Sequence, residues 1–134
     1  MNFNGISVRI LVRKDFGEYF DFCTEKLGLI PVWGDSSGPY ASFAMRENEK
    51  PCIAIFVGKN TEIWKGYKQP PHTTSPDTIA AIITSSNFEE DYNKLKKQGV
   101  EFLDESQFVS GWEMLCVYFR DPEGNLFELN NGEI

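Results

Sequence analysis

The sequence predicts an α+β fold in which two βαβββ modules form a curled, mixed sheet. One observation is that a strand-like period of two gives way to a helical period and then to three extended runs, and that this order occurs twice. A second is that the two copies align with only small slips in register. The two modules, at about residues 5–58 and 77–131, form a single 134-residue domain, and a polar, proline-rich linker at residues 59–76 connects them.

The first module begins with a strand and a helix. Alternation over residues 6–12 predicts a strand with one packed apolar face, made by Ile6, Val8, Ile10 and Val12. Asp15 is the predicted N-cap of an amphipathic helix that covers this face and ends at Gly28. Apolar residues at helical spacing mark the helix, namely Phe16, Phe20, Cys23 and Leu27. Three strands are expected next, at residues 29–33, 40–45 and 52–57.

The second module repeats this order. A strand over residues 78–84 precedes a helix that ends at Gly99, and three strands follow at residues 100–103, 112–119 and 126–129. A shift of 71 residues places Ser7 on Thr78 and Val12 on Ile83, and a shift of 74 places Ala54 on Glu128. The alternative is one α+β sheet with accidental symmetry.

Charge and cysteine content narrow the possible partners and the compartment. The net charge of −7 and a pI near 4.7 argue against nucleic acid and anionic membranes. They mildly favour a cationic or neutral ligand, or serve only for solubility. Cys23, Cys52 and Cys116 lie in apolar stretches without CxxC spacing and indicate buried thiols of a reduced protein. With no signal peptide and no apolar run of about 20 residues, we expect a cytoplasmic protein.

One turn motif is more specific than the rest of the chain. In DPEGNLFEL (121–129), Pro122 and Gly124 suit a tight turn, Asn125 can close it, and a strand follows. Together with residues 12–15, Phe22 and residues 27–29, this motif resembles the glyoxalase / bleomycin-resistance / extradiol-dioxygenase (vicinal oxygen chelate) superfamily. The resemblance covers essentially the whole chain. It implies that each module forms a half-barrel, that the two halves enclose a cleft, and that the protein is a homodimer.

The resemblance also implies where a metal site would lie. Metal-dependent members carry a ligand, usually His or Glu, on the first and last strand of each module. The matching positions here are Ser7, Ala54, Thr78 and Glu128, of which only Glu128 can hold a divalent cation. We therefore expect no metal and no other cofactor. His72, in the linker, would become a ligand only if the linker folded over the cleft.

The remaining residues favour binding of a small molecule. Metal-free relatives, such as the bleomycin-binding proteins, hold a ligand by aromatic stacking and carboxylates. Arg9 lies on the same strand face as Ser7 and can bind a ligand carboxylate or pair with Glu128. The aromatic candidates are Trp33, Tyr40, Trp64, Tyr67, Trp112 and Tyr118, for each of which core packing or a dimer contact is the alternative. The predicted ligand-binding set is Ser7, Arg9, Ala54, Trp64, Thr78, Tyr118 and Glu128.

Three functions are compatible with this set. The first is a metal-independent protein that sequesters a drug or metabolite. The second is a glyoxalase-like lyase or isomerase in which Glu128 is the catalytic base or one metal ligand. The third is a sensor or partner-binding module with a vestigial cleft. Nucleotide-binding and hydrolase motifs are absent from the sequence.

Overall fold

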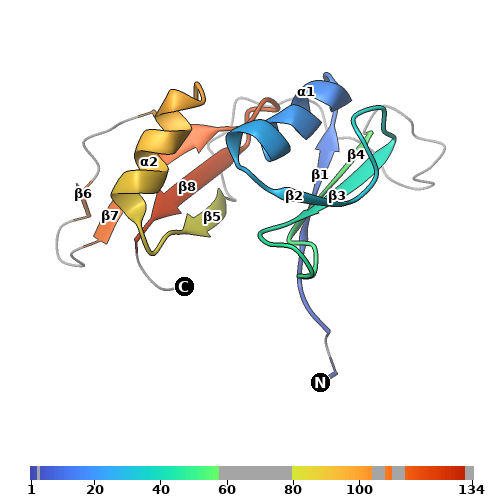
Figure 1. The fold of residues 1–134 in the computed structure, drawn as a ribbon, viewed down its shortest axis with the longest axis horizontal. Coiled ribbons are helices and arrows are strands. Elements are labelled where there is room, and N and C mark those ends of the chain that lie inside the picture. The colour runs from blue at the N-terminus through green and yellow to red at the C-terminus, as the bar shows by residue number, and fades with distance from the viewer. Residues whose placement is uncertain (3, 58–79, 104–107, 110–113, 132–134) are drawn as a thin grey trace. The chain divides into compact units, whose positions relative to one another are not determined.

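The computed structural model describes residues 1–2, 4–57, 80–103, 108–109 and 114–131. The chain divides into two compact units, Met1–Thr73 and Thr74–Ile134 (Figure 1). Each unit contains a four-stranded sheet with parallel and antiparallel pairs, and helical segments connect its first two strands in the chain. This arrangement confirms the predicted α+β class with two mixed sheets.

In unit 1, the helices and strands follow the order of the predicted βαβββ module. β1 (Val8–Val12) is followed by α1 (Phe16–Asp21), and a π-helical turn, η1 (Phe22–Lys26), directly continues α1. Three strands follow, β2 (Ile30–Trp33), β3 (Tyr40–Ala44) and β4 (Ile53–Val57). Their order in the sheet is β1-β4-β3-β2, in which β1 and β4 are parallel and the other pairs are antiparallel.

The predicted helix ends are confirmed, whereas the buried face of the helix differs from the prediction. Asp15 caps α1, since its Oδ1 accepts a hydrogen bond of 2.9 Å from the Glu18 backbone N–H. Gly28 follows the last turn with a φ of 67°. Within η1 the Leu27 N–H donates to the Phe22 carbonyl, five residues back, at 3.0 Å. The buried side chains are Tyr19, Phe22 and Cys23, whereas the predicted Phe16, Phe20 and Leu27 are half-buried.

Only part of the predicted strand face in unit 1 is packed. Ile10 and Val12 are buried, but Val8 is 48% exposed and Ile6, which precedes β1, is 99% exposed. The helix packs over the middle of the sheet, where the Phe20 and Phe43 rings lie 5.3 Å apart. α1 is therefore too short to cover the start of the first strand.

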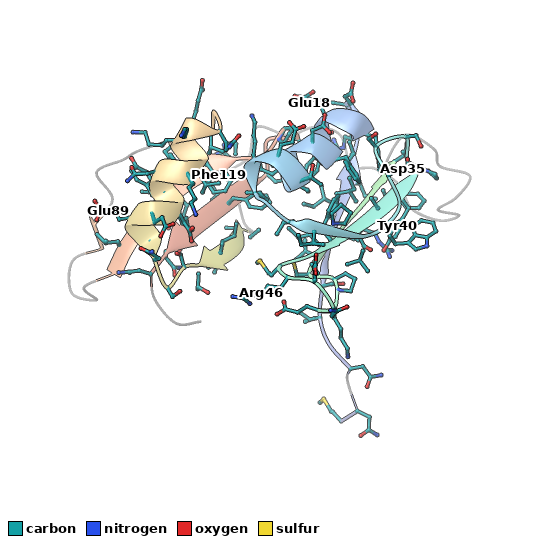
Figure 2. The ribbon with its side chains drawn as sticks, in the orientation of Figure 1. Glu18, Asp35, Tyr40, Arg46, Glu89 and Phe119 are labelled. Atoms are coloured by element: carbon teal, nitrogen blue, oxygen red, sulfur yellow. The ribbon has the colours of Figure 1, made fainter. Side chains whose placement is uncertain are left out.

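Unit 2 contains β5 (Ala80–Thr84), α2 (Phe88–Lys97), β6 (Phe108–Val109), β7 (Met114–Arg120) and β8 (Leu126–Asn130), in the sheet order β5-β8-β7-β6. The predicted strand at residues 100–103 is reduced to an isolated bridge between Phe102 and Phe119, and β6 was not predicted. Rings connect α2 to the sheet, with centroid distances of 4.7 Å for Tyr92 and Phe102 and 5.7 Å for Phe102 and Phe119. Phe119, labelled beside α2 in Figure 2, is fully buried.

Strand pairing revises the register of the internal repeat. Arg9 on β1 is opposite Ala54, and Ile82 on β5 is opposite Glu128. Since Ala54 corresponds to Glu128, Arg9 corresponds to Ile82, two residues further along than the sequence shift of 71 predicts. A slip of two residues keeps every side chain on its face of the sheet. With the revised register, each residue has a different equivalent in the other module, but the face of the sheet to which it points is unchanged.

No helix within the described part of the chain is long and apolar enough to cross a membrane.

Candidate functional site

In unit 1, one row of paired residues runs across all four strands. Arg9 on β1 is opposite Ala54 on β4, Ala54 is opposite Ser42 on β3, and Ser42 is opposite Trp33 on β2. Paired residues point to the same side of a sheet, and Phe43, the neighbour of Ser42, points to α1. We call this set the Arg9–Trp33 row. It lies on the face opposite α1 and places two small side chains between a cation and an indole.

Aromatic rings adjoin the Arg9–Trp33 row on the same face. The Tyr40 ring centroid lies 5.4 Å from that of Trp33 and 6.1 Å from that of Phe56. The Arg9 guanidinium carbon lies 5.8 Å from the Tyr40 centroid, so this side chain reaches from β1 across β4 to β3. Ala54 and Ser42 are only 5% and 3% exposed, whereas Trp33 is 61% exposed. The row thus has two small, buried side chains in its centre, Ala54 and Ser42, and the exposed indole of Trp33 at one end.

In unit 2, a cluster of four polar side chains lies on the face opposite α2. Tyr118 pairs with Glu128, and Cys116 pairs with Asn130. The Asn130 Nδ2 donates a hydrogen bond of 2.7 Å to Glu128 Oε1. We call these four residues the Cys116–Asn130 cluster. They bring two hydrogen-bond donors, Asn130 and Tyr118, to the one carboxylate of the predicted ligand positions.

The cluster also changes the acidity of two of its members. Burial raises the pKa of the Cys116 thiol. The hydrogen bond with Cys116, together with burial and the nearby Glu128 carboxylate, raises the pKa of the Tyr118 phenol. Both groups therefore keep their protons at neutral pH. Within this cluster Tyr118 acts as a hydrogen-bond donor.

The turn between β7 and β8 holds this cluster in register. Asp121 is buried, and its Oδ1 accepts from the backbone N–H groups of Glu123 at 2.9 Å and Asn125 at 2.7 Å. Its Oδ2 accepts from Asn125 Nδ2 at 2.8 Å. Gly124 has a φ of 87°. These contacts confirm the predicted roles of Gly124 and Asn125, and they show that Asp121 organises the turn that sets Tyr118 opposite Glu128.

The family is established by comparison with known proteins. The model of the Glyoxalase/Bleomycin resistance protein/Dioxygenase superfamily matches residues 5–129. This chain belongs to that superfamily.

Individual proteins are similar to this chain in sequence or in fold. An uncharacterized protein of Bacillus subtilis (strain 168), YraH, is 24% identical over 129 residues, which are 92% of this chain and 94% of the relative. A protein of unknown function from Agrobacterium tumefaciens has a similar fold, with a TM-score of 0.73 and 16% identity over 99% of this chain and 97% of that one.

A third relative is a mutant of the fosfomycin resistance protein FosX from Listeria monocytogenes. Its structure was solved with Mn(II) and 1S,2S-dihydroxypropylphosphonic acid. It is 25% identical over 99% of this chain and 94% of that one, with a TM-score of 0.63.

The structure places some of the predicted site residues and leaves others outside its described part. Ala54 lies in the Arg9–Trp33 row and Glu128 in the Cys116–Asn130 cluster, which also contain the predicted Arg9 and Tyr118. Ser7 is exposed and precedes β1 by one residue. Thr78, Trp64, Tyr67, His72 and Trp112 lie outside the described residues, as does all of the linker at residues 59–76.

The described donors do not fit the metal site that the family implies. In unit 1, Ala54 has no donor atom and its partner is the cation Arg9. In unit 2, Glu128 is opposite Ile82, and its Oε1 already accepts from Asn130. Across the described residues, no three His, Cys, Asp or Glu side chains gather into a possible metal site. A divalent cation requires about three such protein ligands.

Sequence reasoning missed Ser42 in unit 1 and Cys116 and Asn130 in unit 2 as site residues. The signal for the last two was available, because each lies two residues from Tyr118 or Glu128 and so shares its face. Ser42 lies two residues from the aromatic candidate Tyr40 and so shares its face, but its place in the row depends on the order of the strands in the sheet.

Proposed function

We propose that this protein binds a small organic molecule without a metal ion, as a protein that sequesters a drug or metabolite. The observation that supports this most is the pairing of Ala54 with Arg9 on the face opposite α1. At a position matching a metal ligand of the family, the chain has a methyl group beside a fixed positive charge. Such a pair disfavours a bound cation and suits an organic ligand with an acidic group.

Glu128 supports a second candidate function. A glyoxalase-like lyase or isomerase would use this carboxylate as its base or as one metal ligand. The hydrogen bond from Asn130 orients the carboxylate, and Tyr118 lies opposite it on the neighbouring strand, as suits a catalytic group. The FosX relative was solved with Mn(II), so a metal at the equivalent site of this chain is the direct competitor of the first proposal.

We also propose the assembly and the setting of this function. The ligand site would be formed by a single domain with modules at residues 5–58 and 77–131 and a linker at 59–76, in a cytoplasmic homodimer. Three free cysteines, two of them buried, suit a reducing compartment. The net charge of −7 disfavours nucleic acid and anionic membranes as partners. We expect an interface that buries at least roughly 1,200 Å² in total. Light scattering should therefore give the mass of a dimer, and a monomer at micromolar concentration would contradict this.

Thermal-shift screening of the chelator-treated protein tests the proposed function. A panel of metabolites and antibiotics should contain a compound that raises the melting temperature in EDTA, since binding to the native state alone stabilises by about 2.7 kcal/mol at a hundredfold excess over Kd. Glu128→Gln and Trp64→Ala should each weaken its binding without unfolding the protein, and Glu128→Gln should act more on cationic compounds. Glu89→Gln, an exposed residue of α2, is the control. If both variants bind the compound as the parent does, the site assignment is wrong.

A further inference from the structure

We infer that the ligand is a planar aromatic anion whose acidic group binds Arg9 and whose ring stacks on Trp33. This inference rests on the proposed function and names the ligand class. It concerns the face of unit 1 opposite α1, where the Arg9–Trp33 row and the rings of Tyr40 and Phe56 lie together.

Arg9 defines the charge of the ligand. It is the only charged residue in β1, β2, β3 and β4. The expectation of a cationic or neutral ligand came from the net charge of −7 for the whole chain. The local charge on these strands is instead positive, and the local charge decides which ligand group can be held there. A planar guanidinium can donate two parallel hydrogen bonds to one carboxylate.

The aromatic residues define the shape of the ligand. Trp33, Tyr40 and Phe56 form a continuous series of ring contacts, and Trp33 is 61% exposed. An indole with this exposure adds little to the core of unit 1. Aromatic faces attract other flat rings in offset or edge-on arrangements, which together with area burial favour a flat ligand over a compact aliphatic one.

The spacing of the row matches a ligand with both features. Arg9 and Trp33 are three strands apart, which is about 14 Å between backbones at normal strand spacing. The two side chains between them, Ala54 and Ser42, are small. The contact of Arg9 with the Tyr40 ring brings its guanidinium toward the middle of this span. Because the Tyr40 ring contacts both Arg9 and Trp33, a bicyclic carboxylate would lie over this ring, with its acidic group at Arg9 and its rings against the indole.

The same positions in unit 2 carry different chemistry. Ile82 stands where unit 1 has Arg9, and Glu128 stands where unit 1 has Ala54. The strand face that corresponds to the Arg9–Trp33 row therefore has a carboxylate and no cation in this pair. At this pair of positions, the cation is found in unit 1 and the carboxylate in unit 2.

Calorimetric titration with three matched probes tests the inference. The probes are 2-naphthoate, the neutral 2-naphthamide and the cationic 2-naphthylmethylammonium, each added to chelator-treated protein at pH 7.5. The parent should bind 2-naphthoate at least tenfold more tightly than either other probe. Arg9→Gln should weaken 2-naphthoate about tenfold or more, and should change 2-naphthamide binding less than threefold.

Further variants separate the role of the ring from that of the charge. Trp33→Leu should weaken 2-naphthoate and 2-naphthamide by a similar factor, whereas Trp33→Phe should retain most of the affinity. Arg46→Gln is the matched control, because Arg46 is an exposed residue at the opposite end of β3 from Tyr40 (Figure 2), paired with Glu49. Circular dichroism checks that each variant is folded, and Arg9→Lys replaces Arg9→Gln if the latter unfolds, with a loss of affinity again expected.

Three results would overturn this inference: no binding of 2-naphthoate to the parent, equal binding by the folded Arg9 variant, or tighter binding of the ammonium probe. The result that contradicts the ligand class differs from the result that contradicts metal-independent binding. If a cationic or neutral compound binds in EDTA and Glu128→Gln weakens it, the ligand class is wrong and metal-independent binding stands. If none of the probes and no compound of the wider panel binds, both are wrong.

Discussion

Replacement of Asp121 by alanine should destabilise the protein by about 3–4 kcal/mol. Asp121 is buried and accepts three hydrogen bonds, two from Asn125 and one from the Glu123 backbone. A hydrogen bond to a charged acceptor contributes about 1.5–3 kcal/mol. Water can replace the acceptor for the exposed Asn125, so we assign about 2 kcal/mol to the half-buried Glu123 contact and about 0.5–1 kcal/mol to each of the other two.

Urea unfolding followed by far-UV circular dichroism measures this loss, which corresponds to a fall in melting temperature of roughly 10–15 °C for a chain of this size. Asp121→Asn is the graded control. Its single carbonyl oxygen can still accept the two backbone N–H groups, so it should lose only about 1–2 kcal/mol. A loss below about 1 kcal/mol for Asp121→Ala, or equal losses for both variants, would refute the idea that this carboxylate organises the β7–β8 turn.

Two further predictions concern unit 2. Phe119→Ala should lower the free energy of unfolding by about 3–5 kcal/mol, because the ring is fully buried between Phe102 and Phe127; a loss under about 1.5 kcal/mol in urea would show that the site collapses. Stability should also fall as the pH rises above the ordinary thiol pKa of 9.0, because the raised pKa values of Cys116 and Tyr118 let the unfolded chain release these protons first. Denaturation midpoints between pH 8 and pH 10.5 measure the fall, and an unchanged slope in the Cys116→Ala and Tyr118→Phe variants would contradict its assignment.

Local chemistry made much of the fold predictable from sequence. The cap at Asp15 and the glycines that end the helices, Gly28 and Gly99, follow from hydrogen bonding and positive φ at single residues. The π-helical turn was not predictable, because the spacing of the apolar residues also fits an uninterrupted α-helix. The slip of the repeat by two residues also escaped detection, because an even slip preserves alternation.

The candidate site was predictable only in part. Alternation along a strand places Arg9 on the face of Ser7, and alternation with the repeat register predicts Tyr118 on the same inward face as Glu128. The Arg9–Trp33 row instead depends on the order β1-β4-β3-β2 and on an irregularity in β2 between Pro31 and Trp33. Sequence periodicity contains no information on strand order, so the contact between Arg9 and Tyr40 required the structure.

Metal titration tests the central claim of metal-independent binding most directly. Chelator-treated protein is titrated calorimetrically with Mn²⁺ and with Zn²⁺, alongside Glu128→Gln, and 2-naphthoate binding is then measured with and without each metal. Ala54 has no donor atom and is opposite the cation Arg9, and Glu128 is opposite the apolar Ile82. We therefore predict no stoichiometric metal site that depends on Glu128, and a 2-naphthoate affinity that metal changes less than twofold. One metal ion per chain, lost in Glu128→Gln and required for ligand binding, would contradict the claim and support a metal-dependent enzyme.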